Sequence, residues 1–216
     1  MIFHDRYDAG ERLVEPLLRL HLRNPLVLGI PRGGVAVAAA IAEKLPAELD
    51  VVLTHKLGAP GQPELAIGAV DESGHITLAP YAKSVPQAYI EEEAANQLEV
   101  MQQRGRLFRA VKPMAAMTDR SVILVDDGLA TGWTMFAAID VVKRYRPYQL
   151  IVAIPVGAKE TVDKLRSVCD RVICLQSPAN FMAVGEFYET FQSTEESEVV
   201  ELLKRSKKYA ATQTDQ

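Results

Sequence analysis

The chain has 216 residues, a net charge of −4, an apolar fraction of 48% and a charged fraction of 24%. This composition is ordinary for a soluble single-domain protein that buries its core without disulfides or metals. Its acidic balance argues against nucleic acid as a partner. The N-terminus lacks a signal pattern, and the longest apolar run, around 35–42, is far below the roughly 20 residues of a membrane helix. We expect a cytoplasmic protein with no membrane partner.

Cysteine and histidine chemistry is sparse. We interpret Cys169 and Cys174, the two cysteines, as small apolar fillers in a reducing compartment. The four histidines are scattered, with no pair at ligand spacing on a shared element. We therefore expect none of them to bind a metal.

Strand-like apolar runs alternate with helix-length segments, which predicts βα units around a mainly parallel sheet. The spacing of apolar residues predicts an amphipathic helix over Arg12–Leu22, then a buried strand over Leu26–Ile30 and an Ala/Val-rich helix over Val35–Leu45. Another strand is predicted over Asp50–His55. A loop is expected over Lys56–Glu64, because it contains two glycines and two prolines in nine residues.

The second part of the chain continues the alternation. A hairpin is expected from Ala66–Val70 and His75–Leu78, and a long surface helix over Val85–Phe108. Further strands are predicted over Ser121–Val125, Leu150–Pro155 and Val172–Leu175, and helices over Gly132–Tyr145, Lys159–Val168 and Glu195–Lys207. We expect one domain over 1–207 and a flexible polar tail over 208–216.

The most informative segment is SVILVDDGLATGWT, from Ser121 to Thr134. An apolar strand brings Asp126 and Asp127 to its carboxyl end, where open α/β sheets bind ligands. The small-residue loop that follows opens a helix, and its N–H groups suit a phosphate, with Thr131 as a further donor. The carboxylates suit the vicinal hydroxyls of a ribose. The alternative is a plain turn whose second aspartate caps the helix.

A second anion loop is expected at GIPRGG, residues 29–34. A strand ends here, two glycines allow backbone to approach a ligand, a helix begins, and Arg32 offers a charged fork. The alternative is a tight turn with an exposed arginine. Neither a Gly-x-x-x-x-Gly-Lys-Ser/Thr loop nor a dinucleotide-binding Gly-x-Gly-x-x-Gly order is present.

The Val122–Thr134 segment has four apolar residues, two acidic residues and a loop ending in Thr-Gly with a threonine shortly after. It resembles the phosphoribosyl-diphosphate-binding motif of type I phosphoribosyltransferases. The chain is also similar, over nearly its full length, to a group of predicted bacterial phosphoribosyltransferases. The pattern shared with that group includes Phe3-x-Asp5-Arg6-x-x-Ala9-Gly10, Leu28-Gly29-x-Pro31-Arg32-Gly33-Gly34, Lys56-Leu57-Gly58-Ala59-Pro60 and Glu64-Leu65-Ala66-Ile67-Gly68-Ala69.

The resemblance implies a Rossmann-like α/β fold, a mainly parallel sheet flanked by helices, with a small hood or lid region. The hood would come from the N-terminal and 176–194 segments. The implied reaction transfers the 5-phosphoribosyl group from phosphoribosyl diphosphate to a nitrogenous acceptor such as a base, and releases diphosphate. The alternative function is a non-catalytic regulator that senses phosphoribosyl diphosphate. The sequence leaves open a homodimer.

Site residues are also implied by the resemblance. Asp126 and Asp127 would hold the ribose and a Mg²⁺ ion, mostly through water or ribose hydroxyls. Arg32 and Lys56 would stabilise the departing diphosphate. Remaining substrate contacts would come from Pro31, Gly33 and Gly34 in the diphosphate loop and from Gly128, Leu129, Ala130, Thr131, Gly132 and Thr134 around the 5-phosphate. The Pro31–Arg32 peptide is expected to be cis, as is common in such loops.

Three local features concern the lid and the acceptor. The Lys56–Glu64 segment stands where family members carry a mobile lid, although Lys56 could instead be a solvated lysine. Phe181 resembles the phenylalanine that stacks on the purine in hypoxanthine–guanine phosphoribosyltransferases, the alternative being an aromatic core plug. Ala130 replaces an aspartate that handles a proton in those purine enzymes, so a purine acceptor does not carry over.

Two further features are undecided by the sequence. Trp133 stands where family members have lysine or a small residue, and it would wall the phosphate pocket or pack beside it. For Asp5 and Arg6 we favour a role in fixing the N-terminus, with contact to substrate as the alternative.

Overall fold

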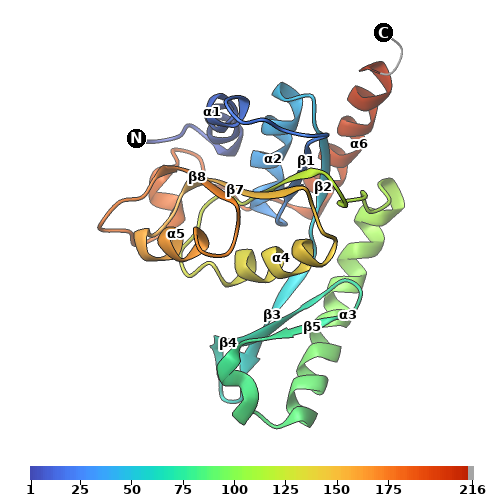
Figure 1. Ribbon diagram of the computed structural model, residues 1–216, viewed down its shortest axis with the longest axis vertical. Helices are drawn as coiled ribbons and strands as arrows, with labels where there is room; N and C mark the ends of the chain where they lie inside the picture. The colour runs from blue at the N-terminus through green and yellow to red at the C-terminus, as the bar shows by residue number, and fades with distance from the viewer. Residues whose placement is uncertain (214–216) are drawn as a thin grey trace.

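In the computed structural model, a five-stranded parallel sheet forms the body of the molecule (Figure 1). The structure describes residues 1–213, except for the side chains of residues 63, 64, 80 and 207–213. The strand order is β2-β1-β6-β7-β8, and every neighbouring pair is parallel. This confirms the predicted α/β sheet. The strands are β1 Leu26–Gly29, β2 Glu48–Val51, β6 Ser121–Val125, β7 Gln149–Val156 and β8 Arg171–Gln176.

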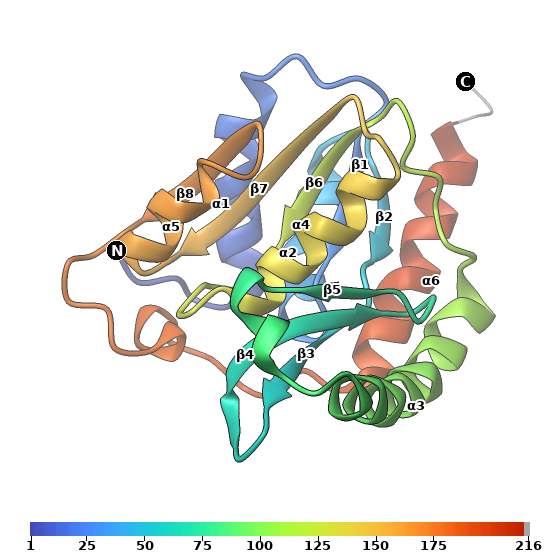
Figure 2. The same cartoon turned by 60° about the horizontal axis from the view of Figure 1, so that its bottom comes forward.

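Helices cover both faces of the sheet (Figure 2). The cause is visible in β6, whose residues alternate between two apolar cores because successive side chains point to opposite faces. Ile123 and Val125 belong to one core, and Val122 and Leu124 belong to the other, all fully buried. The first core also contains side chains of α1 (Arg6–Leu18), α2 (Gly33–Lys44) and α6 (Glu196–Gln213). The second contains side chains of α4 (Trp133–Arg144) and α5 (Lys159–Leu165).

A second, antiparallel sheet projects from the body as an arm (Figure 1). It contains β3 (Thr54–Ala59), β4 (Gln62–Asp71) and β5 (Ile76–Leu78), followed by the 3₁₀ helix η1 (Pro80–Ser84) and the long helix α3 (Gln87–Val111). The predicted hairpin of β4 and β5 is confirmed. Its turn is held by Asp71, whose Oδ1 accepts hydrogen bonds from the N–H groups of Ser73 and His75.

Two predictions about this region are wrong. The expected strand over Asp50–His55 covers the end of β2 and the start of β3, which lie in different sheets. The expected loop over Lys56–Glu64 is mostly strand, with a tight turn between Ala59 and Gln62. The glycines are accommodated by an irregular register at Gly58 and by a left-handed φ of 71° at Gly61. Full burial of Leu57 helps to fix the strand.

Two helix boundaries also differ from the prediction. The first helix begins at Arg6, not Arg12, because the Asp5 carboxylate caps it by accepting the Asp8 N–H, and it ends at Leu18. The last helix continues beyond the predicted Lys207 to Gln213, so residues 208–213 are helical, and the rest of the expected tail lies outside the described residues. Within residues 1–213, no helix is long and apolar enough to cross a membrane.

A buried ion-pair network joins the arm to the body. Asp50 of β2 is fully buried and accepts a hydrogen bond from Arg109 Nη1 at 2.8 Å, while its other oxygen accepts the Ala115 N–H at 2.8 Å. Arg109 lies on α3 and also binds both carboxylate oxygens of Glu72, beside the β4–β5 turn, at 2.7 and 3.0 Å. One guanidinium thus connects the sheet, the long helix and the arm.

Candidate active site

The two predicted anion loops lie side by side at the carboxyl ends of β1 and β6, which are neighbours in the sheet. The chain leaves β1 towards β2 on one side and leaves β6 towards β7 on the other. The loops therefore flank the point where strand order reverses, which is where open α/β sheets bind ligands. The loops also touch each other, because a Cβ at Gly34 would lie 2.7 Å from the Val125 carbonyl oxygen and 2.9 Å from Asp126 Cα.

The loop after β6 presents backbone donors. Among the described residues, nothing accepts a hydrogen bond from the N–H groups of Ala130, Thr131 and Gly132. Hydrogen bonds to β7 and α5 fix the loop. The Leu129 N–H donates to the Val156 carbonyl at 3.0 Å, and Thr161 Oγ1 donates to the Ala130 carbonyl at 2.6 Å. Gly132 has a φ of 76° and opens α4, whose first turn carries Thr134. A fixed loop with unpaired N–H groups at a helix N-terminus is suited to bind an anion.

Two carboxylates stand at the start of this loop. The Asp127 N–H donates to Asp126 Oδ1 at 2.9 Å. Burial and the neighbouring charge of Asp127 raise the pKa of the Asp126 carboxyl well above its usual range. Tyr188 Oη donates to the Asp127 carbonyl at 2.6 Å, and burial raises the pKa of Tyr188, so its hydroxyl keeps the proton that it donates.

Arg6 contacts this site, whereas the sequence favoured a role for it in fixing the N-terminus. Its Nε donates to Asp127 Oδ2 at 2.7 Å, and Nη1 donates to the Gln192 carbonyl at 2.6 Å. The guanidinium also lies over the Phe191 ring, 4.0 Å from its centroid. The available signal was the short Phe3-x-Asp5-Arg6 pattern, which does not say what the arginine contacts.

The loop after β1 has the expected cis peptide between Pro31 and Arg32. Arg32 is half-exposed; its Nη2 donates to Ser193 Oγ at 3.4 Å, and Nη1 lies 3.9 Å from Glu195 Oε2. The guanidinium thus lies beside residues 193 and 195.

The start of β3 lies against the same loop. Thr54, His55 and Arg104 line a cavity of about 30 Å³ together with Pro31. Burial and the charge of Arg104 lower the pKa of His55. The half-buried Lys56 is the next residue of β3 and pairs with Ala69 of β4. The hairpin that replaces the expected lid loop thus begins beside the loop after β1, and its mobility stays a prediction.

The segment after β8 lies against the β6 loop. Gly128 packs on Val184 of the 3₁₀ helix η2 (Val184–Phe187), so closely that a Cβ would lie 2.5 Å from Val184 Cγ1. Phe181 stacks on Phe187 with 5.8 Å between ring centroids and an interplanar angle of 10°. The Phe3 N–H donates to the Phe187 carbonyl at 2.8 Å, which joins the N-terminus to this segment. Stacking of Phe181 on an acceptor stays a prediction.

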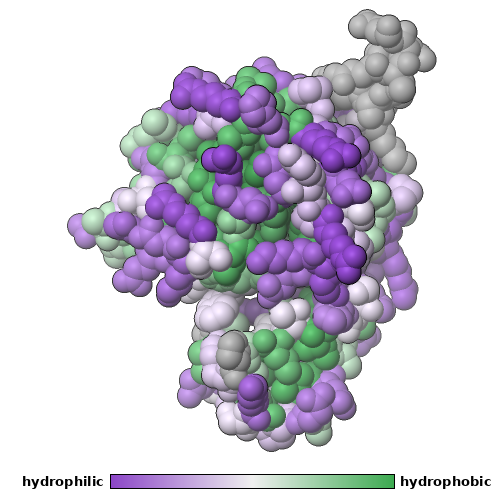
Figure 3. Space-filling view, viewed as in Figure 1, coloured by the Kyte–Doolittle hydropathy of each residue, from purple (hydrophilic) through white to green (hydrophobic). Residues whose placement is uncertain are grey.

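Trp133 faces the arm. Its ring meets Phe136 edge-on at 6.4 Å and lines a cavity of about 250 Å³ between α4 and the arm, together with Leu78 and Tyr81. Figure 3 shows apolar side chains gathered on this arm. Trp133 thus packs towards the arm, next to the loop after β6.

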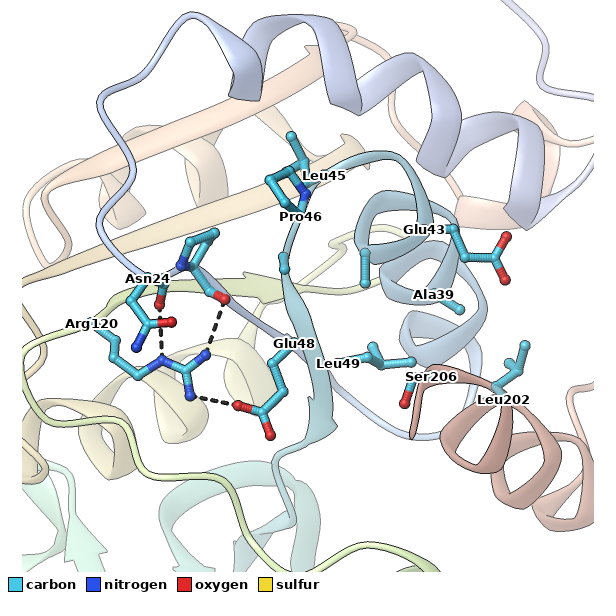
Figure 4. A pocket seen from close by; sticks show the side chains of 13 residues that line it. Asn24, Ala39, Glu43, Leu45, Pro46, Glu48, Leu49, Arg120, Leu202 and Ser206 are labelled. Atoms are coloured by element: carbon cyan, nitrogen blue, oxygen red, sulfur yellow. Dashed lines mark hydrogen bonds and ion pairs between the residues drawn. The ribbon is translucent and has the colours of Figure 1, made fainter. Parts of the chain in front are cut away.

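A cavity of about 330 Å³ lies near the amino ends of β1, β2 and β6, at the other end of these strands from the two loops (Figure 4). Arg120 donates to Glu48 at 2.6 Å and to the carbonyls of Asn24 and Pro25, and Lys112 donates to the same glutamate at 2.9 Å. The charges of this cavity therefore pair with groups of the protein itself. It contains none of the predicted site residues.

The fold and the two loops define an α/β protein whose two candidate anion loops flank a topological switch point. A family model described as phosphoribosyl transferase domain matches residues 3–191, so the chain belongs to the phosphoribosyl transferase family. It is similar to the crystal structure of TT1426 from Thermus thermophilus, with 46% identity and a TM-score of 0.90 over 95% of this chain and 99% of that one. The AQ2163 protein from Aquifex aeolicus, 12% identical over 83% and 78% of the chains with a TM-score of 0.52, shares the fold alone.

Two Mycobacterium tuberculosis proteins that carry provisional names as phosphoribosyl transferases are each 39% identical over 208 residues. The match covers 95% of this chain and 47% of theirs. The chain therefore spans about half the length of the curated relatives that it matches.

Proposed function

We propose that the protein transfers the 5-phosphoribosyl group from phosphoribosyl diphosphate to a nitrogenous acceptor and releases diphosphate. The observation that carries this proposal is the β6 loop, where the N–H groups of residues 130–132, which have no acceptor in the part of the chain that the structure describes, follow Asp126 and Asp127 after Gly128 and Leu129. A phosphate bound to those N–H groups brings the hydroxyls of its ribose close to the carboxylates. The second loop, with Arg32, adjoins them and suits a diphosphate.

In the proposed reaction, the bond between C1 of the ribose and the diphosphate oxygen breaks, and its electron pair leaves with the diphosphate. A lone pair of the acceptor nitrogen forms the new C1–N bond, and that nitrogen gives up a proton. Asp126 and Asp127 balance the positive charge that grows on the sugar, while Arg32 and Lys56 stabilise the negative charge that grows on the diphosphate. Ala130 carries no group that could take the acceptor's proton, so the acceptor must lose it elsewhere.

Mg²⁺ is part of the proposal. Among the described residues, no group of three or more His, Cys, Asp or Glu side chains could hold a metal ion by itself. Two adjacent carboxylates fit an ion that takes most of its oxygen ligands from the diphosphate, the ribose and water. The ion would neutralise charge on the diphosphate. Asp126 and Asp127 would hold it mainly through water or ribose hydroxyls.

The test measures the release of diphosphate from phosphoribosyl diphosphate in the presence of Mg²⁺, with each of a panel of bases and amines as the acceptor. We expect release with at least one acceptor. Tight binding of phosphoribosyl diphosphate without release for any acceptor would instead indicate a sensor. No binding would overturn the proposal.

Arg32→Gln is expected to lower kcat/KM for phosphoribosyl diphosphate by about tenfold to a hundredfold, because one charge-assisted hydrogen bond is worth roughly 1.5–3 kcal/mol. Steady-state kinetics of diphosphate release measures it. Arg23→Gln is the control, since Arg23 is exposed and lies over the Tyr148 ring, just before β1 at the opposite end of that strand from the loop. Equal losses for both variants would mean that Arg32 has no specific role.

A further inference from the structure

We propose that Arg6 is a positioning residue of this site, which holds the Asp127 carboxylate where it accepts hydrogen bonds from the ribose hydroxyls. The inference rests on the proposed function, because the ribose is that of phosphoribosyl diphosphate. It brings the N-terminal segment into the binding of the sugar.

The Arg6–Asp127 contact is largely buried, and other groups of the protein hold it in place. The two side chains are 13% and 16% exposed, and Nε and Oδ2 are 2.7 Å apart. The guanidinium is fixed from two other directions, by the Gln192 carbonyl and by the face of Phe191. Phe191 in turn stacks on Tyr188, whose hydroxyl binds the Asp127 carbonyl. Backbone and side chain of Asp127 are therefore both held by one assembly.

This pair lies at the junction of the two anion loops. A Cβ on Gly33, in the loop after β1, would lie 2.8 Å from Arg6 Nε and 2.8 Å from Asp127 Cγ. Glycine at this position leaves room for the pair. The arginine thus reaches the centre of the site from the first residue of α1.

The contact leaves Asp127 able to bind a ligand. A carboxylate has about four lone-pair sites on two oxygens, and Arg6 Nε occupies one of them on Oδ2. A fixed carboxylate presents its remaining sites in one orientation, which reduces the entropy lost when the ribose binds.

Other contacts already fix the N-terminus. Asp5 caps α1, and Phe3 pairs with the 187–189 backbone on both sides, donating to the Phe187 carbonyl and accepting from the Glu189 N–H, each at 2.8 Å. Arg6 is not needed for that anchoring. Its contact with Asp127, the residue that we expect to bind the ribose, therefore indicates a role in the site.

The experiment compares binding of ribose 5-phosphate and of inorganic diphosphate by calorimetry, each with Mg²⁺. Arg6→Gln should weaken the binding of ribose 5-phosphate by about tenfold to a hundredfold, because a displaced Asp127 would lose about one charge-assisted hydrogen bond to the ribose. The binding of inorganic diphosphate should be unchanged. Arg12→Gln is the matched control, because Arg12 lies on the same helix and pairs with Asp8. In an Asp127→Asn background, Arg6→Gln should add little, since the two residues act as one unit.

Arg6→Lys keeps the charge and should bind ribose 5-phosphate with intermediate affinity; it replaces Arg6→Gln if the latter fails to fold in a thermal melt. Unchanged ribose 5-phosphate binding in the substituted protein would overturn the role of Arg6. Equal losses for both ligands would also overturn it, because they indicate general damage. If the unsubstituted protein binds neither ligand, the proposed function fails and this inference fails with it.

Discussion

Gly33→Ala is expected to lower the affinity for phosphoribosyl diphosphate by a hundredfold or more while the fold persists. The new methyl group would overlap the Asp127 carboxylate and crowd Arg6, and both side chains would have to move. A displacement of about 1 Å in a positioned group can cost a factor of about a hundred. Stability should be kept, because Gly33 is the first residue of α2 and alanine favours helix over glycine by up to about 1 kcal/mol.

Calorimetry with phosphoribosyl diphosphate and a thermal melt measure the two quantities. Gly105→Ala is the control, because Gly105 lies inside α3 and a Cβ there meets Leu53 Cδ1 at an ordinary 3.4 Å. That variant should bind normally and be at least as stable as the unsubstituted protein. Normal binding by Gly33→Ala would contradict the geometry of the site.

The sequence predicted the order of the two carboxylates and the following loop, because the signals for this candidate site are local. A strand with four consecutive apolar residues, two aspartates and a small-residue loop are contiguous, so the order Asp126, Asp127 and then the 128–132 loop follows from the chain itself. The alternation of strands and helices likewise predicted the parallel sheet. Neither inference needs knowledge of which distant segments touch.

The rest depends on contacts between distant parts of the chain. The Lys56–Glu64 segment has the composition of a loop, yet Leu57 is buried and pairs with Gly68, so tertiary packing overrides local preference. Arg6 and Asp127 are 121 residues apart, and no spacing rule connects them. Such pairs become visible when the fold brings the segments together.

Asp50→Ala is expected to lower the free energy of unfolding by about 3–5 kcal/mol, the usual cost of breaking a buried ion pair from one side. The substitution removes the acceptor of the Ala115 N–H and one of the two carboxylates that bind Arg109. Denaturant unfolding measures the change. Asp163→Ala is the control: it also removes an aspartate paired with an arginine, but on the exposed face of α5, and should change little.

Asp50→Asn should lower the free energy of unfolding by less than Asp50→Ala does, because the amide oxygen still accepts a hydrogen bond and the amide carries no buried charge. Burial raises the pKa of Asp50 above its usual value of 3.8. The folded protein therefore binds this proton more tightly than the unfolded chain, so the contribution of Asp50 is largest below about pH 4 and declines as the pH rises. The stability advantage of the unsubstituted protein over Asp50→Asn should thus be larger at pH 4 than at pH 7. An advantage that grows with pH would mean that the ion pair with Arg109 outweighs the cost of burying the carboxylate.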